Sequence, residues 1–249
     1  PGRDQPGQDE PGRDRAGPVR PVAPEGTLVL SLVVGLLVVA VMAIGVTKLV
    51  DDVTEGGGVA VLDHPVARFV VPRRVRPLTT VLDVVTNAGG PVGMAVLALI
   101  AGVLLGVAWR SWTPPLVLGV TYAGIGGITL VVKSVVGRPR PPVAHAVQSA
   151  PGFSFPSAHA AVAIAVCGAV AWLCGLRLRS WAGRAALWSA AAMIAALVGL
   201  SRIYLGVHWT SDVLGGWALG ALWLAVVISA WTVFTRSRRT RAPADPEVP

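Results

Sequence analysis

Six runs of apolar residues, each about as long as a bilayer is thick, constrain this chain more than any other feature. A helix needs about 20 consecutive apolar residues to cross the hydrocarbon layer, and it satisfies its backbone hydrogen bonds internally. The runs therefore predict an all-α, polytopic membrane protein whose six transmembrane helices form one bundle. The expected spans are Leu28–Val50, Pro91–Trp109, Pro115–Val136, Ser157–Leu176, Ala185–Tyr204 and Ser211–Phe234.

Composition supports a membrane protein and argues against one that binds nucleic acid. Charged residues make up 14% of the chain, whereas a soluble domain carries about 25%. The formal net charge is +8, and such a chain can bind nucleic acid when a soluble fold gathers its cations on one face. Here most arginines stand at the ends of apolar runs, as topology signals do, so we expect no nucleic-acid partner.

The polar stretches divide the chain into a membrane domain and two tails. Residues 1–26 are rich in Pro, Gly and charged residues and predict a disordered N-terminal tail. Residues 27–235 form the predicted membrane domain, and residues 236–249 a basic, disordered C-terminal tail. The first apolar run is too long for the core of a signal peptide, so we interpret it as a retained anchor.

The connection at residues 51–90 is expected to lie at the membrane interface. Four of its apolar residues recur at the spacing of one helix face: Leu78, Val81, Leu82 and Val85. Arginines precede this stretch, so the helix can lie among anionic head groups. A solvated loop helix packed on the bundle would show the same pattern. The pattern therefore does not decide between an interfacial helix and a solvated one.

The first polar cluster, Lys133–Pro141, ends the third span. Lys133 lies near the end of an apolar helix, where an unpaired ammonium is costly and usually functional, although snorkelling to the interface would also place it there. Arg140 stands between two prolines in stiff backbone and is suited to clamp a phosphate through two hydrogen bonds. Arg138 has a similar setting and is the alternative clamp.

The second polar cluster, Pro156–His159, begins the fourth span. Ser157 is expected at the N-cap, where its hydroxyl can bond a first-turn amide or a ligand. The amides of Ala158 and His159 would point out of the positive end of the helix, which favours anions. The ring of His159 would stand beside that anion site, although a plain interfacial histidine has the same position.

The third polar cluster, Ser201–Asp212, joins the fifth span to the sixth. It contains Arg202 at the end of one span, and His208 and Asp212 four residues apart. Residues at that spacing share a helical face, provided that the sixth span starts early enough. A carboxylate bonded to Nδ1 of the histidine would fix its tautomer and leave Nε2 as nucleophile or base.

The arginines also predict an orientation. With both tails in the cytoplasm, the links at Arg110 and Arg177–Arg184 lie on the cytoplasmic side, as the positive-inside rule requires. The three polar clusters then face the extracytoplasmic side. The arginines at 68–76 fall on that side too, against the rule. That the clusters share one face depends only on the number of spans between them.

In this order and spacing, the clusters resemble the signature of the type 2 phosphatidic acid phosphatase family. The family pattern is a lysine seven residues before Arg-Pro, then Pro-Ser-Gly-His, then Ser-Arg followed by a spaced His and Asp. The matching residues are Lys133, Arg140, Pro141, Pro156, Ser157, His159, Ser201, Arg202, His208 and Asp212. The lysine-to-arginine spacing selects Arg140 over Arg138. Ala158 stands where the family usually has Gly, and its amide can still donate.

The resemblance implies a role for each of these residues. His208 would attack phosphorus and form a phosphohistidine, with Asp212 orienting it. His159 would protonate the leaving oxygen and later activate water. The groups expected to hold the phosphoryl oxygens are Lys133, Arg140, Ser157, the amide of Ala158 and Arg202. No cofactor and no metal is implied, because fixed cations supply the electrostatic stabilisation.

We therefore expect a multi-pass phosphatase of the cell membrane that hydrolyses lipid phosphates or diphosphates at the extracytoplasmic face. Candidate substrates are a polyprenyl diphosphate, phosphatidylglycerol phosphate and phosphatidic acid. A lipid phosphotransferase with an acceptor other than water is one alternative. A non-catalytic lipid-binding or transport protein is another, which the retained histidines and Asp212 disfavour. A vanadate-dependent haloperoxidase would have a similar site, but those enzymes are soluble.

Overall fold

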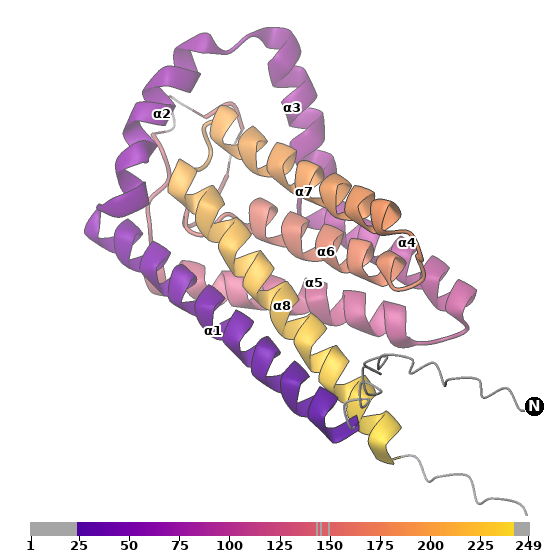
Figure 1. The fold of residues 1–249 in the computed structure, drawn as a ribbon. Helices are drawn as coiled ribbons and strands as arrows, with labels where there is room; N and C mark the ends of the chain where they lie inside the picture. Colours follow the sequence, from indigo (N-terminus) through magenta and orange to yellow (C-terminus); the bar gives the residue numbers. More distant parts are fainter. Residues whose placement is uncertain (1–23, 143, 145, 149, 242–249) are drawn as a thin grey trace, which may run out of the picture.

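The structure, a computed structural model, describes residues 24–142, 144, 146–148 and 150–241. These residues form eight α-helices and two short 3-10 helices, with no strand among them. Figure 1 shows their arrangement. The elements are α1 (Pro24–Glu55), η1 (Gly58–Leu62), α2 (Asp63–Val70), η2 (Val71–Arg73), α3 (Arg76–Ala88), α4 (Pro91–Trp109), α5 (Thr113–Val136), α6 (Ala158–Gly175), α7 (Trp181–Tyr204) and α8 (Thr210–Arg241).

Six of these helices, α1 and α4 to α8, are long and apolar enough to cross a membrane. This confirms the predicted all-α, six-helix architecture. Helix α8 continues to Arg241, into the segment where the sequence predicts a disordered tail. The reason is a contact with α1, because the guanidinium of Arg236 donates to the carbonyl oxygen of Thr27 and to the hydroxyl of Ser31. Most of the predicted N-terminal tail lies outside the described residues.

Helix α6 is the centre of the bundle because its side chains are small. It contacts α4, α5, α7 and α8, and 67% of its span is buried, the highest share among the six. Gly216 and Gly220 let α8 approach it closely, as small residues four apart do in membrane bundles. A β-carbon on Gly216 would lie 2.6 Å from the carbonyl oxygen of Ser157. This contact brings the first turn of α8 against the first turn of α6.

Helix α1 lies on the outside of the bundle, along α8 (Figure 1). In the most apolar 18-residue stretch of its span, no residue is buried. Its apolar side chains face outward, as expected for a helix that is surrounded by lipid. Helix α1 finishes at the end of the bundle where the polar clusters lie, and the chain continues there through η1 into α2.

The connection between α1 and α4 forms an arch over that end of the bundle (Figure 1). Within it, α3 packs against α7. The predicted apolar face of α3 is divided, since Leu82 and Val85 turn partly inward while Leu78 and Val81 are exposed, together with Val84. The helix therefore packs on the bundle and also presents an apolar outer face, so it combines both of the structures that the sequence allows.

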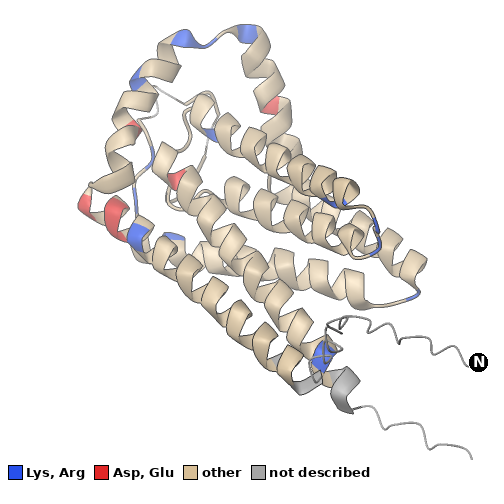
Figure 2. Ribbon diagram, in the orientation of Figure 1, with Lys and Arg blue, Asp and Glu red and all other residues tan. Residues whose placement is uncertain are grey.

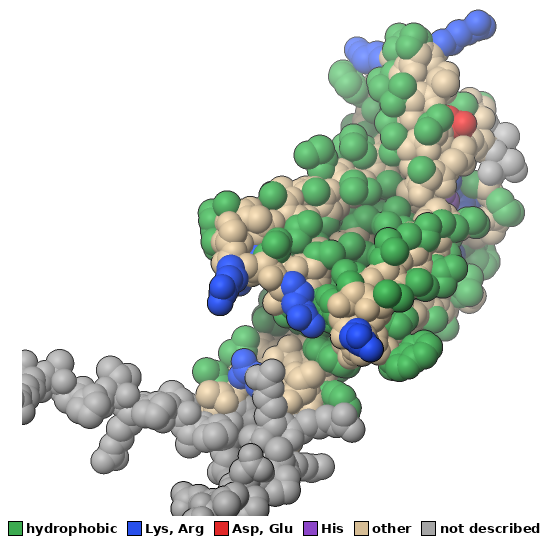
Figure 3. Space-filling view, turned by 90° about the vertical axis from the view of Figure 1, so that its right-hand side faces the viewer, with side chains coloured by type: hydrophobic (Ala, Val, Ile, Leu, Met, Phe, Trp, Pro, Cys, Tyr) green, Lys and Arg blue, Asp and Glu red, His purple; other side chains and the backbone are tan. Residues whose placement is uncertain are grey.

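Charged side chains gather near the two ends of the bundle and leave the middle free of charge (Figure 2). On one face, apolar side chains cover the surface between basic groups at its upper and lower edges (Figure 3). The end formed by the α4–α5 and α6–α7 links carries Arg110, Arg177, Arg179 and Arg184. A charge-free layer between two charged ends matches the layered structure of a bilayer.

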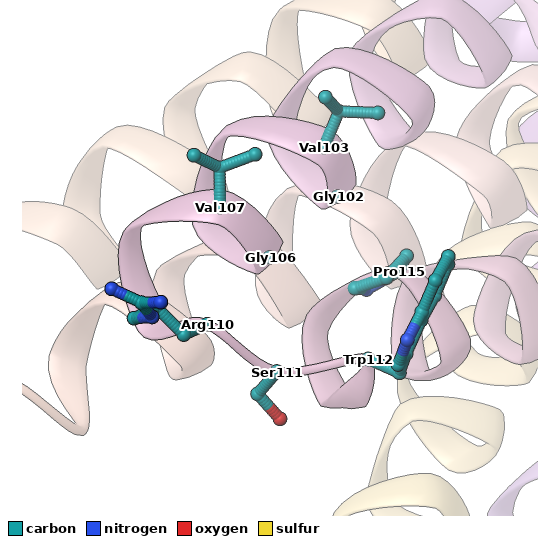
Figure 4. Close-up of a pocket in the computed structure, with 8 residues that line it drawn as sticks. All are labelled: Gly102, Val103, Gly106, Val107, Arg110, Ser111, Trp112 and Pro115. Carbon is teal, nitrogen blue, oxygen red and sulfur yellow. The ribbon is translucent and has the colours of Figure 1, made fainter.

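A hollow of about 340 Å³ lies between the end of α4 and the start of α5 (Figure 4). Gly102 and Gly106 line it and face Pro115, whose Cα would lie 3.1 Å from a β-carbon on Gly102. Its surface is mostly apolar, with Arg110 at its edge. It lies at the end of the bundle away from the first turn of α6, so it is not where the polar clusters meet.

Candidate active site

Three segments that are far apart in the sequence meet at the first turns of α6 and α8. Arg138, after α5, donates a hydrogen bond of 2.6 Å to the carboxylate of Asp212 in α8. The backbone N–H of Ser157, before α6, donates to the carbonyl oxygen of Asp212 at 2.9 Å. The structure therefore places all three polar clusters at one end of the bundle, as the number of spans predicts.

Lys133 ties the end of α5 to the loop that precedes α6. Its Nζ donates to the carbonyl oxygens of Phe153 (2.6 Å) and Ser154 (3.2 Å). Helix α5 ends at Gly137, whose φ of +62° turns the chain out of the helix in the left-handed conformation. An ammonium has three donors, so the two described bonds leave one for a ligand.

Arg140 connects the same loop to His208. Its Nε and Nη2 donate to the carbonyl oxygens of Gly152 (3.0 Å) and Pro151 (3.2 Å). Its Nη1 donates to the carbonyl oxygen of Val207 at 2.7 Å and lies 3.2 Å from Nε2 of His208. A guanidinium has donors only. The Nε2 atom of His208 must therefore be the acceptor, and the ring carries its proton on Nδ1.

This tautomer directs the Nδ1–H of His208 at Oδ2 of Asp212, 3.3 Å away. His208 and Asp212 are paired, but they do not share a helical face as their spacing predicts. Helix α8 begins at Thr210, and His208 lies in the turn before it. Instead, Asp212 reaches back from the first turn of α8 and accepts the backbone N–H of Trp209 at 2.8 Å. A carboxylate at this position of a helix commonly caps the turn in this way.

Asp212 is surrounded by donors. It is 0% exposed, and besides His208 and Trp209 it accepts hydrogen bonds from Nη1 of Arg138 and the hydroxyl of Ser154. So many donors, one of them a cation, stabilise the ionised carboxylate. The positive end of α8 acts in the same direction.

His208 is held as a neutral imidazole. It is 4% exposed, and this burial lowers its pKa to about 4, although the hydrogen bond to Asp212 acts in the opposite direction. Near pH 7 the ring is therefore uncharged, with its lone pair on Nε2. This is the form of histidine that can attack an electrophile.

The first turn of α6 provides an anion site. The helix begins at Ala158 with Ser157 at the N-cap, as predicted, but the Ser157 hydroxyl makes no capping hydrogen bond. That hydroxyl is buried and has no partner among the described residues. Backbone amides of a first turn attract anions, so the hydroxyl and the amides of Ala158 and His159 together suit a phosphoryl group.

His159 lies against the start of α4. A β-carbon on Gly90 would stand 2.9 Å from Nε2 of His159, so the ring fits there because residue 90 has no side chain. The ring also lies within electrostatic reach of His208, Arg202 and Lys133. The two predicted catalytic histidines therefore belong to one site.

Arg202, at the end of α7, is held by the arch and the loop. Its Nη1 donates to the hydroxyl of Thr86 (2.8 Å) and to Oε1 of Gln148 (3.1 Å). Gln148 in turn donates to the carboxylate of Asp83 on α3. The Nε of Arg202 is buried without a partner among the described residues. Buried polar atoms without partners are rare, and this one and the hydroxyl of Ser157 both suit a phosphate oxygen.

Sequence reasoning missed several residues that support the site. It treats Arg138 only as an alternative phosphate clamp, whereas this guanidinium bonds to Asp212 and to Asp63 of α2. It gives no role to Thr86, Gln148 or Asp63. Asp63 and Gln148 lie outside the periodic apolar pattern of the connection, and Thr86 lies one turn after Leu82 on the predicted helix, where the pattern does not show which side turns inward.

Comparisons with known proteins agree with this arrangement. A family model described as the PAP2 superfamily matches residues 114–236. The chain is 32% identical over 161 residues to phosphatidylglycerophosphatase B of Bacillus subtilis (strain 168), covering 64% of this chain and 78% of that protein. It is 33% identical over 151 residues to decaprenylphosphoryl-5-phosphoribose phosphatase of Mycobacterium tuberculosis (strain ATCC 25618 / H37Rv), covering 59% and 77%.

A solved structure has the same fold. It is the crystal structure of a transmembrane PAP2-type phosphatidylglycerolphosphate phosphatase from Bacillus subtilis. The two structures superpose with a TM-score of 0.69 at 26% sequence identity, over 83% of this chain and 98% of that chain. The similarity therefore extends beyond residues 114–236, into the first helix or the arch.

Proposed function

The chain belongs to the PAP2 superfamily and is a lipid phosphate phosphatase with a membrane-spanning bundle; from this premise we propose that it works through a phosphohistidine at His208. One observation carries the proposal. Nε2 of His208 accepts from Arg140 while Nδ1 faces the buried carboxylate of Asp212. A neutral imidazole is thus oriented with its lone pair toward a cation that binds phosphate well.

In the first step, Nε2 of His208 attacks phosphorus, a P–N bond forms, and the P–O bond to the lipid breaks. The leaving oxygen takes a proton from His159. The ring of His208 becomes positively charged, and Asp212 stabilises that charge through Nδ1–H. The phosphoryl oxygens are held by Lys133, Arg140, Arg202, the hydroxyl of Ser157 and the amide of Ala158.

In the second step, a water molecule attacks the phosphohistidine. His159, now without its proton, accepts a proton from this water, as the reverse of its first role. The P–N bond breaks, inorganic phosphate leaves, and His208 returns to its neutral form. The cations act at both steps, because negative charge develops on the same oxygens each time.

The proposed substrates are lipids whose tails stay in the bilayer while the phosphate reaches the site. A hollow of about 330 Å³ opens next to Arg140, Gln148 and Val207 and offers room for the part of the head group beyond the phosphate. The names of the two curated relatives refer to lipid-linked phosphates. A polyprenyl diphosphate, phosphatidylglycerol phosphate and phosphatidic acid are therefore the substrates to compare.

We further propose that the site faces the extracytoplasmic side. The supporting observation is that Arg110, Arg177 and Arg179 lie in the links at the opposite end of the bundle and Arg184 in the first turn of α7 beside them, and cytoplasmic loops carry such an excess. A charged, water-soluble phosphate ester that does not cross membranes is then hydrolysed by right-side-out vesicles. Hydrolysis only by inverted vesicles would reverse the orientation.

The experiment that tests the mechanism is phosphate release in detergent with EDTA present. Wild type, His208→Ala and His159→Ala are each supplied with the three lipids. We expect release by wild type in EDTA and none by His208→Ala. With His159→Ala, release from the lipids is slow, because the first step lacks its acid and the second step its base. With p-nitrophenyl phosphate, whose leaving group needs little protonation, the variant still forms the phosphohistidine, and phosphate accumulates on the protein in acid-sensitive form.

Three outcomes contradict the proposal. Release by well-folded His208→Ala at the wild-type rate removes this histidine as nucleophile. Label on wild-type His208 that passes to an added alcohol faster than to water identifies a phosphotransferase. No label and no release from any lipid identifies a lipid-binding protein on the same bundle.

A further inference from the structure

Asp63 is a buried carboxylate outside the family match. It begins α2 and is 2% exposed, although the connection that carries it runs over the end of the bundle. Its Oδ1 accepts the backbone N–H of Ser211 at 2.9 Å, and its Oδ2 accepts the hydroxyl of Ser211 at 2.6 Å. Ser211 lies in the first turn of α8, so Asp63 satisfies one of the N–H groups that every helix start leaves without a partner.

Arg138 links this carboxylate to the one beside His208. Its Nη2 donates to Asp63 at 2.7 Å and its Nη1 donates to Asp212 at 2.6 Å. The same Nη1 lies 2.7 Å from the hydroxyl of Ser211. One cation is therefore shared by two buried carboxylates, and the hydroxyl of Ser211 contacts both the cation and Asp63.

The charges in this cluster explain why two carboxylates are present. If Arg138 faced only Asp212, its positive charge would neutralise the carboxylate that must stabilise the imidazolium of His208. Because Asp63 takes the other half of the guanidinium fork, the cluster keeps one negative charge in excess. The low dielectric of a buried site makes such a charge strongly felt by its neighbours.

We propose that Asp63 is a positioning residue for the His208–Asp212 pair. It fixes the fork of Arg138 and the first turn of α8, so that Asp212 keeps both its geometry and its negative charge toward Nδ1 of His208. This inference rests on the proposed nucleophilic role of His208. It assigns part of the catalytic machinery to α2, which lies before the residues 114–236 that the family model matches.

A purely structural role for Asp63 makes a different prediction. If the residue only attached α2 to α8, its loss would reduce the amount of folded protein and leave the turnover of the folded fraction unchanged. If it acts through Arg138, its loss lowers kcat but leaves phosphate binding intact, because Asp63 contacts none of the groups that hold the phosphate. An interaction that matters only in the transition state has this kinetic pattern.

The test compares Asp63→Asn with Asp52→Asn in the full-length protein in detergent. Asp52 is the matched control, since it is a buried carboxylate of the same region that bonds to Lys48 and to the N–H of Val59. We expect Asp63→Asn to lower kcat and the rate of His208 phosphorylation by about tenfold or more, with KM and inhibition by inorganic phosphate within about twofold. Asp52→Asn keeps the wild-type kcat per folded molecule.

A second variant keeps the test decisive if Asp63→Asn does not fold. Arg138→Lys retains the positive charge, but an ammonium cannot bridge two carboxylates as a planar fork does. We expect the same loss of kcat at constant KM from Arg138→Lys alone. Where Asp63→Asn folds, adding it to Arg138→Lys causes little further loss, because residues of one network are not additive. Independent, multiplicative losses overturn the inference.

The outcomes separate this inference from the proposed mechanism. Wild-type phosphorylation of His208 together with wild-type kcat in both Asp63→Asn and Arg138→Lys removes the role of Asp63 and leaves the mechanism intact. A matched rise in KM and in the phosphate inhibition constant also overturns it, because it would place Asp63 among the phosphate-binding groups. Absence of any label on wild-type His208 overturns the mechanism itself.

Discussion

Arg202 donates a hydrogen bond of 2.8 Å to the hydroxyl of Thr86, 116 positions earlier in the chain. Thr86 belongs to α3, whose outer face is apolar and exposed. The arch therefore does more than join two membrane spans, because it holds one of the cations that are proposed to bind phosphate. The contact predicts which variants will weaken phosphate binding without removing a catalytic group.

Thr86→Val should weaken phosphate binding. Valine has the shape of threonine but cannot accept the hydrogen bond, and a bond to a charged group contributes about 1.5–3 kcal/mol. We expect KM and the inhibition constant of inorganic phosphate to rise about tenfold together. The control is Thr80→Val on the same helix, whose exposed hydroxyl bonds only to the carbonyl oxygen of Arg76 among the described contacts. Equal effects of both variants would contradict the prediction.

Gly90→Ala should impair proton transfer to the leaving group. The new β-carbon would stand 2.9 Å from Nε2 of His159, closer than packing allows, so the ring must move. We expect kcat for an alkyl lipid phosphate to fall about tenfold or more, whereas p-nitrophenyl phosphate, whose leaving group needs little protonation, is affected less. Gly126→Ala is the control, since no atom lies within 4 Å of its new β-carbon. The same loss on both substrates would refute the role of His159 as acid.

Acidification should destabilise the protein partly through His208. Burial lowers the pKa of this ring to about 4, whereas it is about 6.5 in an unfolded chain. Between these values the unfolded chain binds more protons, so stability falls as the pH decreases from about 6.5 to 4. The measurement is the midpoint of thermal unfolding in detergent at pH 7 and pH 5. We expect His208→Gln to lose less on acidification than wild type; an equal loss would show that other groups dominate.

The outer face of α3 should matter for substrates with long tails. Leu78, Val81 and Val84 are exposed there, so replacing all three with Ser removes contact with lipid while leaving the packed side of the helix intact. We expect turnover of a long-chain lipid phosphate to fall more than that of a water-soluble short-chain analogue. A matched triple Ser variant at Val92, Val96 and Leu99 on α4, which are also exposed, should change the turnover of both substrates alike. Equal slowing of the two substrates by the α3 variant would remove the idea.

The sequence predicts the membrane spans because their length and composition follow directly from the bilayer. It also predicts that the clusters containing Lys133, His159 and His208 lie at the same end of the bundle, since an even or odd number of spans decides at which end a link lies. It does not predict which side of α3 turns inward, because lipid and protein core are both apolar and give the same pattern. Leu82 and Leu78 are thus equivalent in sequence and different in the structure.

The supporting residues of the site could not be predicted for a different reason. Asp63 on α2, Thr86 on α3 and Gln148 in the loop before α6 reach the site through the path that the chain takes between membrane spans, and local periodicity says nothing about such paths. The turn before α8 is a similar case. The spacing of His208 and Asp212 suggests one helical face, but the pair forms through a helix-capping contact with the N–H of Trp209.

The lengths of the helices have a further consequence. Helix α6 has 18 residues, and α1 and α8 have 32 each, so α6 rises about 27 Å and the two longer helices about 48 Å. The hydrocarbon layer is about 30 Å thick, so α6 alone is slightly shorter than the layer, and we expect His159 in its first turn to lie at the edge of the layer, where lipid phosphates lie. A thicker membrane would increase this mismatch and draw that edge past the histidine. We therefore expect the rate of hydrolysis to depend on the thickness of the host bilayer.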